Sequence, residues 1–176
     1  MEKYLKNTKQ ITITESIKNI SDGFQQKNTD LILEILDWIF NNFKNIENNK
    51  KEKNKLFRKR TADEIIESRK TSGCTDYAIV FIALARAKGI PTKYIEAIRK
   101  RWLDIGDENC IEGHIFAECL IKNRWYIIDP QEGSIRADYR RYVIFKKGFD
   151  SWDIGIRNLE DLREKFLSFR ETYSQN

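Results

Sequence analysis

Hydrophobic residues recur at steps of three and four along the first part of the chain, which is the spacing of amphipathic helices. The pattern is loose over residues 13–26 and strong over residues 30–45. Asp30 stands just before the stronger series, at the position of an N-cap. The lysine- and asparagine-rich residues 45–55 predict an exposed loop. Two helices followed by a loop are therefore expected at the start.

The next two predicted helices lead to the most informative part of the sequence. Thr61 and Glu64 have the spacing of a capping box, which predicts a short helix through Ser68. In residues 72–91 (SGCTDYAIVFIALARAKGIP), nearly every position after the cysteine is apolar or small, with a helical period. We therefore expect a helix that is buried on most sides and ends at Gly89, with a proline just beyond.

The period of the pattern changes after this helix from that of helices to that of strands. Strands are predicted over residues 92–98, 113–121, 124–129 and 139–146. Only Lys122 and Asn123 separate the second and third strands, which is the spacing of a hairpin. Helices first and antiparallel strands afterwards predict an α+β fold, in which the buried helix packs on an antiparallel sheet.

The length of 176 residues, with two prolines and eight glycines, predicts one domain over residues 1–176. Its expected parts are a helical preface (1–70), a core helix and sheet (71–146) and a C-terminal helical segment (147–176). That last segment contains an amphipathic helix, predicted over residues 157–173.

Charge and composition narrow the class of protein. The net charge is +5, and much of the excess lies in residues 50–60 (KKEKNKLFRKR). Because aromatic residues hardly interrupt this block, it predicts a solvated loop, with some attraction to acidic partners but no nucleic-acid function. No run of about 18 apolar residues and no signal-peptide core occurs, so we expect no membrane association. Three widely spaced cysteines argue against a disulfide framework, and a cytoplasmic location is expected.

Cys74 is the first candidate for chemistry. A lone cysteine is more often a small buried hydrophobe than a nucleophile. Here, however, the residue follows a glycine at the first turn of the buried helix. The free N–H groups and the positive end of the helix dipole favour the thiolate there, and can also hold an oxyanion. Cys74 is therefore the expected nucleophile.

His114 and Asp129 complete a candidate triad. His114 is the single histidine and the natural general base near neutral pH. Asp129 ends an apolar strand, where a carboxylate is costly unless it is paired. If the two-residue loop is correct, the residue numbers of each pair across the hairpin sum to 245. His114 and Asp129 then project from the same face as diagonal neighbours, within reach of a hydrogen bond. The expected roles are general base and orienting carboxylate.

A structural zinc site is an alternative use of some of the same atoms. Three cysteines and one histidine are a known zinc ligand set (Cys74, Cys110, Cys119 and His114). The spacing opposes it, because no Cys-x-x-Cys pair occurs and His114 and Cys119 face opposite sides of one strand. We therefore expect no metal and no cofactor.

Two sequence blocks resemble the transglutaminase-like superfamily. GCTDYAIVFIALARAKGIPTKYI resembles the cysteine helix of that family, and GHIFAECLIKNRWYIIDP resembles its histidine strand followed by a strand that ends in Asp-Pro. The helix that contains Trp38 matches the one that usually precedes this core. Asp76 and Glu118 also match, and we interpret them as structural, Glu118 in a salt bridge with an arginine.

The resemblance implies a papain-like fold that transfers an acyl group from a peptide or protein amide through a thioester at Cys74. A hydrolase, with water as the acceptor, is the first hypothesis, because the chain shows no further cross-linker machinery. A protein-glutamine transamidase would use the same triad with an amine acceptor, and the sequence does not separate the two. The third hypothesis is a binding module that keeps the fold without activity.

Overall fold

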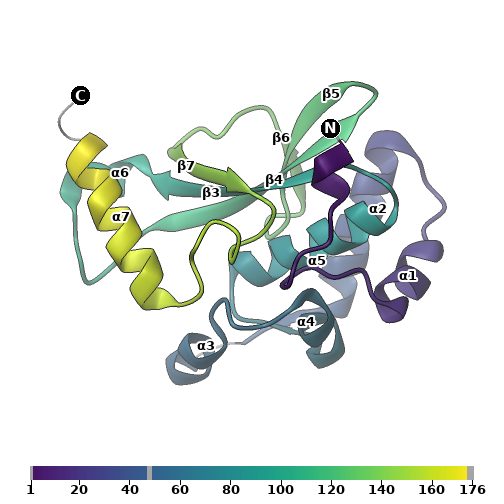
Figure 1. Cartoon of the computed structure of the whole chain (residues 1–176), viewed down its shortest axis with the longest axis horizontal. Coiled ribbons are helices and arrows are strands. Elements are labelled where there is room, and N and C mark those ends of the chain that lie inside the picture. Colours follow the sequence, from purple (N-terminus) through teal and green to yellow (C-terminus); the bar gives the residue numbers. More distant parts are fainter. Residues whose placement is uncertain (1, 47–48, 174–176) are drawn as a thin grey trace.

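The computed structural model describes residues 2–46 and 49–173. A five-stranded antiparallel sheet packs on one side against a central helix, and further helices surround that helix on its other sides (Figure 1). This arrangement confirms the predicted α+β fold. The strands follow the order β6-β5-β4-β3-β7 in the sheet. Their bounds are β3 Thr92–Arg99, β4 Gly113–Ile121, β5 Arg124–Asp129, β6 Ser134–Arg136 and β7 Tyr142–Gly148.

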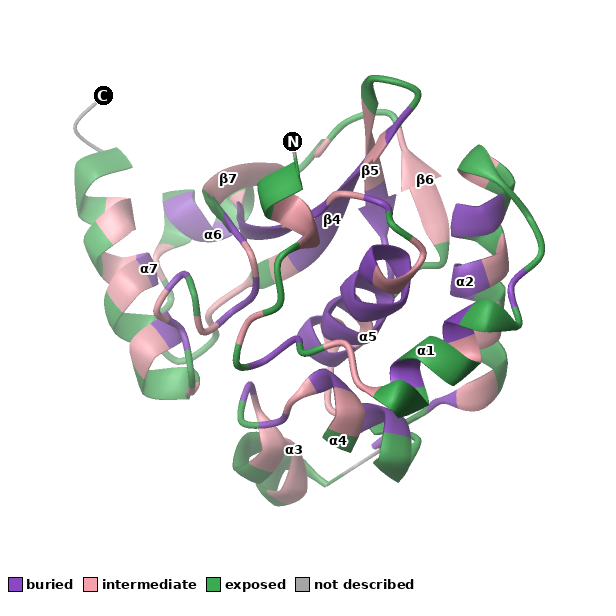
Figure 2. Ribbon diagram, turned by 45° about the vertical axis from the view of Figure 1, so that its right-hand side comes forward, coloured by how far each residue is buried: buried purple, intermediate pink, exposed green. Residues whose placement is uncertain are grey.

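The central helix is α5 (Cys74–Ala87), which is the predicted buried helix. Its ribbon is buried along most of its length, between the sheet and the neighbouring helices (Figure 2). Even Arg86 is buried, where its guanidinium donates hydrogen bonds to the carbonyls of Thr92 and Phe149. A helix with so little solvent contact needs apolar or small residues on all sides, as the sequence pattern indicated.

Shorter elements cover the remaining sides of α5 and the ends of the sheet. The helices α1, α2 and α4 contact α5 directly, whereas α7 lies beside the sheet at the opposite end of the molecule (Figure 1). The elements are η1 Glu2–Leu5, α1 Glu15–Asp22, α2 Asn28–Asn42, β1 Lys44–Asn45, α3 Lys50–Leu56, α4 Ala62–Ser68, β2 Lys70–Thr71, α6 Lys100–Ile105 and α7 Leu159–Tyr173.

Several local predictions were wrong. The N-cap of α2 is Lys27, and Asp30 lies inside the first turn of the helix, where a negative charge still favours the dipole. Residues 50–56 form α3 instead of an exposed loop, with Asn49 as its N-cap. The short elements α6 and β6 were not predicted, because six and three residues are too few to show a period. The last strand begins at Tyr142, three residues later than expected.

The hairpin formed by β4 and β5 has the predicted register. Ala117 pairs with Ile128, and Ile121 pairs with Arg124, so paired residues sum to 245. Lys122 and Asn123 form the two-residue turn, with φ of 46° and 66°. Two positive φ values in a two-residue hairpin loop are those of a type I′ turn, whose twist matches that of the strands. The loop length therefore determines which side chains share a face.

The two faces of the sheet differ. One face contributes to the main core around α5, with side chains such as Tyr94, Ile115 and Ala117. The other face, which we call the His114 face, holds a smaller buried cluster of Ile95, Ala97 and Phe116. Ala97 pairs with His114 and Ile127 pairs with Arg136, so these side chains also belong to the His114 face.

Candidate active site

Cys74 begins α5 and is partly exposed to solvent. Gly73 is its N-cap residue and has no side chain to cap the helix. The N–H groups of Asp76 and Tyr77 donate to the carbonyl of Gly73, so the N–H of Cys74 lies before the first intrahelical bonds. A side chain at Gly73 would meet no atom within 4 Å, which means that the space beside the cysteine is open. The helix start is thus accessible to a substrate.

Asp76 holds the chain in front of Cys74. Its carboxylate accepts hydrogen bonds from the backbone N–H and the hydroxyl of Ser72, both at 2.7 Å. The same oxygen accepts a bond from Arg60 at 2.6 Å, in an ion pair that is almost completely buried. A carboxylate with three donors is a strong local anchor. The nucleophile therefore follows a segment that is fixed by a charged group.

His114 is the second residue of β4 and contacts Asp129. Its Nε2 lies 2.9 Å from Oδ1 of Asp129. Burial disfavours the imidazolium, but hydrogen bonds to Asp129 and to Cys74 outweigh it and raise the pKa of His114 to about 10. The ring packs edge-on against Phe116 and beside Tyr142, with centroid distances of 4.8 and 5.5 Å. The structure thus places His114 against Asp129, with Cys74 within electrostatic range of the same imidazole.

Asp129 has the surroundings that a buried carboxylate requires. Its side chain is 4% exposed, so an unpaired charge there would be costly. Besides the contact with His114, its Oδ1 accepts a hydrogen bond from the backbone N–H of Glu132 at 3.2 Å. These partners leave the carboxylate oriented toward the imidazole. Such a contact selects one tautomer and one orientation of the ring.

A buried ion pair near Cys74 was missed by the sequence prediction. Arg58 donates to both carboxylate oxygens of Glu96, at 2.6 and 2.8 Å, and the hydroxyl of Tyr94 donates to the same carboxylate. Burial disfavours the charged guanidinium, but the charge of Glu96 more than compensates and raises the pKa of Arg58, with a smaller contribution from Cys74. The pair therefore lies within electrostatic range of the nucleophile.

The prediction that residues 50–60 form a solvated loop was consequently wrong for two of its arginines. Arg58 and Arg60 are buried, and each pairs with a carboxylate at least 16 residues away in the sequence. No local pattern signals such a residue, because its partner is brought in only by the tertiary fold. The single available signal was the mixture of Phe57 with the basic residues, which suggests that this segment is not uniformly exposed.

Glu118 also differs from its predicted partner. Lysines, not an arginine, neutralise it: Lys147 donates to one oxygen at 2.6 Å and Lys93 to the other at 2.8 Å. Tyr139 donates a third bond at 2.5 Å. Burial raises the pKa of this carboxyl, but the three donors outweigh burial and hold the pKa below its usual range. Glu118 therefore joins β3, β4, the 137–141 loop and β7 on the His114 face.

The alternative zinc ligand set is not assembled. Within residues 2–46 and 49–173, no group of three or more His, Cys, Asp or Glu side chains could hold a metal ion. Cys119 is buried beside the hydroxyl of Thr92, and burial raises the pKa of its thiol to about 12. Cys110 is exposed in the loop before β4. The three cysteines thus have separate environments.

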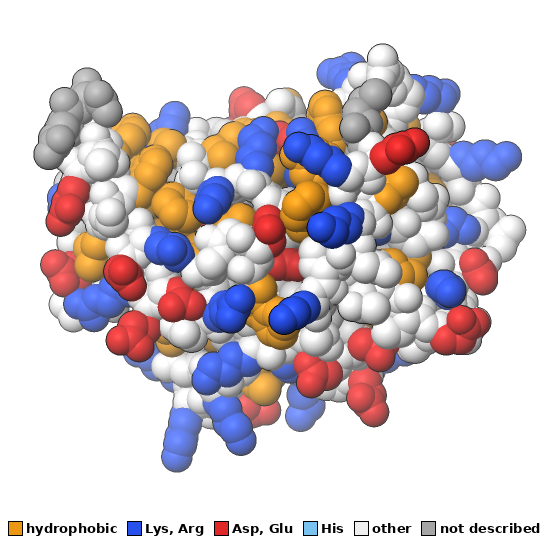
Figure 3. Space-filling view, viewed as in Figure 1, with side chains coloured by type: hydrophobic (Ala, Val, Ile, Leu, Met, Phe, Trp, Pro, Cys, Tyr) orange, Lys and Arg blue, Asp and Glu red, His pale blue; other side chains and the backbone are white. Residues whose placement is uncertain are grey.

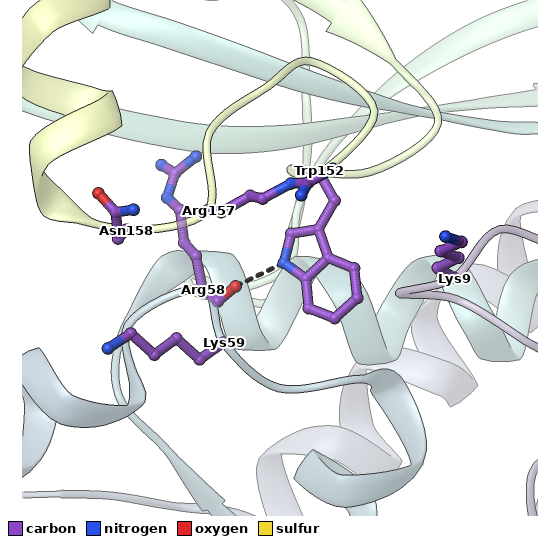
Figure 4. Close-up of a pocket in the computed structure, with 6 residues that line it drawn as sticks. All are labelled: Lys9, Arg58, Lys59, Trp152, Arg157 and Asn158. Carbon is purple, nitrogen blue, oxygen red and sulfur yellow. Dashed lines mark hydrogen bonds between the residues drawn. The ribbon is translucent and has the colours of Figure 1, made fainter.

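One pocket is lined by candidate-site residues, and a second is lined by Arg58 of the buried ion pair. The first, of about 410 Å³, is lined by His114 and Asp129 together with residues from β3, β6 and the loops on either side of β6. The second, of about 430 Å³, lies on the side of Arg58, between that residue, Trp152 and Arg157 (Figure 4). The indole N–H of Trp152 donates to the carbonyl of Arg58 at 2.6 Å and so closes one wall of the second pocket. A substrate therefore has space beside His114 and Asp129.

None of the helices in the described part of the chain has the length and apolar character needed to cross a membrane.

Comparison with known proteins identifies the family and the fold. The sequence model of the transglutaminase-like superfamily matches residues 16–130. A crystal structure from Cytophaga hutchinsonii, of a protein named a "putative cysteine protease", superposes with a TM-score of 0.67 at 22% sequence identity. The match covers 88% of this chain and 48% of that protein, so the chain spans about half of its length. No curated protein matches the sequence significantly.

Proposed function

The chain belongs to the transglutaminase-like superfamily, and from that premise we propose that it is a cysteine hydrolase that cleaves a peptide or protein amide through a thioester at Cys74. One observation carries the proposal: Nε2 of His114 lies 2.9 Å from Oδ1 of Asp129, and Cys74 is close enough to raise the pKa of the same imidazole. This arrangement provides a nucleophile, a proton carrier and a group that orients the proton carrier. We propose these three residues as the catalytic set.

In the first half of the reaction, the thiolate of Cys74 attacks the carbonyl carbon of the amide. The carbonyl oxygen becomes an oxyanion, which the backbone N–H of Cys74 stabilises at the positive end of α5. The imidazolium of His114 then gives its proton to the nitrogen of the amide. The C–N bond breaks, the amine leaves, and the acyl group stays on the sulfur as a thioester.

In the second half, water attacks the thioester while neutral His114 takes one of its protons. The C–S bond breaks, the carboxylic acid leaves, and the thiolate–imidazolium pair is restored. Asp129 keeps its charge throughout and stabilises the imidazolium each time it forms. The balance is one amide and one water consumed for one acid and one amine. An amine in place of water would give transamidation by the same steps.

Thiol labelling tests the nucleophile directly. With limiting iodoacetamide at neutral pH, we expect Cys74 to be labelled ahead of the exposed Cys110 and the buried Cys119, as measured by peptide mass spectrometry. Equal labelling of Cys74 and Cys110 would count against an activated thiol. Incubation of wild type and Cys74→Ala with a panel of peptides, with and without a primary amine, then tests the reaction. Hydrolysis is supported if only the wild type forms products whose masses together equal that of the peptide plus one water. Products that contain the added amine indicate transamidation.

A further inference from the structure

The pocket beside His114 and Asp129 is unusually rich in arginine. Four arginines line it, from three different parts of the chain: Arg99, Arg136, Arg140 and Arg141. The carboxylates in the same lining are Asp129, which already contacts His114, and Glu132. The pocket therefore has a positive balance of charge beside His114 and Asp129 of the proposed catalytic set.

The register of the sheet explains why these charges meet. Arg136 pairs with Ile127 on one edge of the sheet, and Arg99 pairs with Tyr142 at the other. Because side chains alternate along a strand, both arginines project from the His114 face. His114 lies between them on the central strand β4. The arginines thus flank the imidazole from two sides.

Two of the four arginines already have an acidic partner. Arg99 lies 2.9 Å from Glu112, and Arg140 lies 3.8 Å from Asp138 in an exposed pair. Among the described residues, no carboxylate lies within ion-pair distance of Arg136 or Arg141. Arg136 is half-buried and Arg141 is exposed. These two guanidinium groups are therefore the ones available to a ligand.

We infer that this pocket binds a carboxylate side chain of the substrate, next to the residue whose amide is cleaved, so that the enzyme prefers acidic peptides. The inference rests on the proposed function and adds the substrate class. A guanidinium presents a planar pair of donors that matches a carboxylate in two parallel hydrogen bonds. A pocket of about 410 Å³ has the size of a small ligand site and accepts one or two amino-acid side chains.

This location differs from the one that the sequence suggested for acidic partners. The first part of the basic block of residues 50–60 forms α3, which lies at the lower edge of the molecule, where Lys and Arg side chains project in the space-filling view (Figures 1 and 3). The β6 strand lies at the upper side in the same view (Figure 1). Residues Lys51 and Lys55 in α3 are exposed, and neither lines the pocket. Replacing these two lysines removes the same charge as replacing two arginines of the pocket, but at a place outside it.

Binding to the Cys74→Ala protein tests the inference without turnover. The probes are two fluorescein-labelled, end-blocked peptides, each with a central glutamine: one flanked by glutamates and one in which glutamines replace the glutamates. By fluorescence anisotropy at low salt, we expect the acidic peptide to bind about tenfold more tightly than its isostere. Adding Arg136→Gln and Arg141→Gln together should remove most of this preference. Arg141→Gln alone, which changes only an exposed loop residue, should weaken acidic binding about threefold.

The control is the pair Lys51→Gln and Lys55→Gln, which removes the same charge and should leave the preference unchanged. Equal affinity for both peptides, or no binding of either at about 1 mM, would overturn the inference. An equal loss in the control pair would also overturn it, because the preference would then reflect net charge alone. Selective labelling of Cys74 and cleavage of neutral peptides are independent of this outcome. Failure of the proposed function and failure of the specificity are therefore distinguishable.

Discussion

The Nε2 atom of His114 lies 2.9 Å from Oδ1 of Asp129, although the two residues are diagonal neighbours and not a directly opposed pair in the β4–β5 hairpin. A diagonal contact of this kind exists because the Lys122–Asn123 turn has an even number of residues. A hairpin register shifted by one residue would place the two side chains on opposite faces of the sheet. The length of the turn therefore decides whether His114 and Asp129 can contact each other at all.

Replacing Asp129 with asparagine tests whether this carboxylate orients His114 or contributes to the binding of substrate. The neutral amide keeps the size of the side chain but neither stabilises the imidazolium nor selects its tautomer. We expect kcat to fall by about 10²- to 10⁴-fold with little change in KM. Asp37→Asn is the matched control, since Asp37 is exposed in α2 and carries the same charge. A fall in kcat/KM that comes only from a higher KM, with kcat unchanged, would contradict the proposed role.

The stability of the protein should depend on pH through His114. Its pKa is raised from 6.5 to about 10 in the folded protein, so folding binds the proton more tightly. The resulting stabilisation is complete below pH 6.5 and is lost as the pH rises through about 10. We expect the difference in urea midpoint between wild type and His114→Gln to shrink across this range. A difference that grows with pH would contradict the raised pKa.

Breaking the buried pair of Arg58 and Glu96 should be strongly destabilising. In Glu96→Gln, the guanidinium of Arg58 would remain buried without a charged partner, which typically costs about 3–5 kcal/mol. Urea denaturation measures this cost, with the exposed Glu67→Gln as the control. The double variant Arg58→Met with Glu96→Leu should be less destabilised than Glu96→Gln, because it leaves no buried charge. A double variant that is as unstable as the sum of the two single changes would argue against this explanation.

The anchor at Asp76 should affect both stability and the nucleophile. Asp76→Asn removes the charge that holds Arg60 and Ser72, and we expect a loss of about 1–3 kcal/mol in unfolding free energy. The segment before Cys74 should also loosen, so iodoacetamide should label that thiol more slowly at equal protein concentration. Asp37→Asn, an exposed change in α2, serves as the control. Unchanged labelling with lowered stability would mean that the anchor supports the fold only.

The type I′ turn allows a stabilising substitution. Lys122 has φ of 46°, a left-handed conformation that asparagine adopts more easily than lysine. Lys122→Asn should therefore raise the unfolding free energy by about 0.5–1 kcal/mol, measured by thermal or urea denaturation. The activity should not change, since the register is the same. A destabilised Lys122→Asn variant would indicate that the lysine side chain stabilises the turn in some other way.

Much of the proposed site could be predicted because its signals are local. The first turn of α5, the single histidine and the two-residue turn each lie within a few residues of the sequence. Strand alternation and loop length then relate His114 to Asp129 without any knowledge of the sheet order, whereas Cys74 was joined to them by its chemical role at a helix start and by the family resemblance. The short elements α6 and β6 lacked such signals, and both were missed.

The sequence by itself determined the class of fold, the bounds of β4 and β5, and which of their side chains share a face, since all of these follow from local periodicity and one turn. Only the tertiary structure decided that Arg58 is buried against Glu96, 38 residues away. It also decided that Arg99 and Arg136 meet His114 on one face of the sheet. The physical reason is that these contacts join segments far apart in the sequence, and the packing of the whole chain that brings them together leaves no trace in the local pattern.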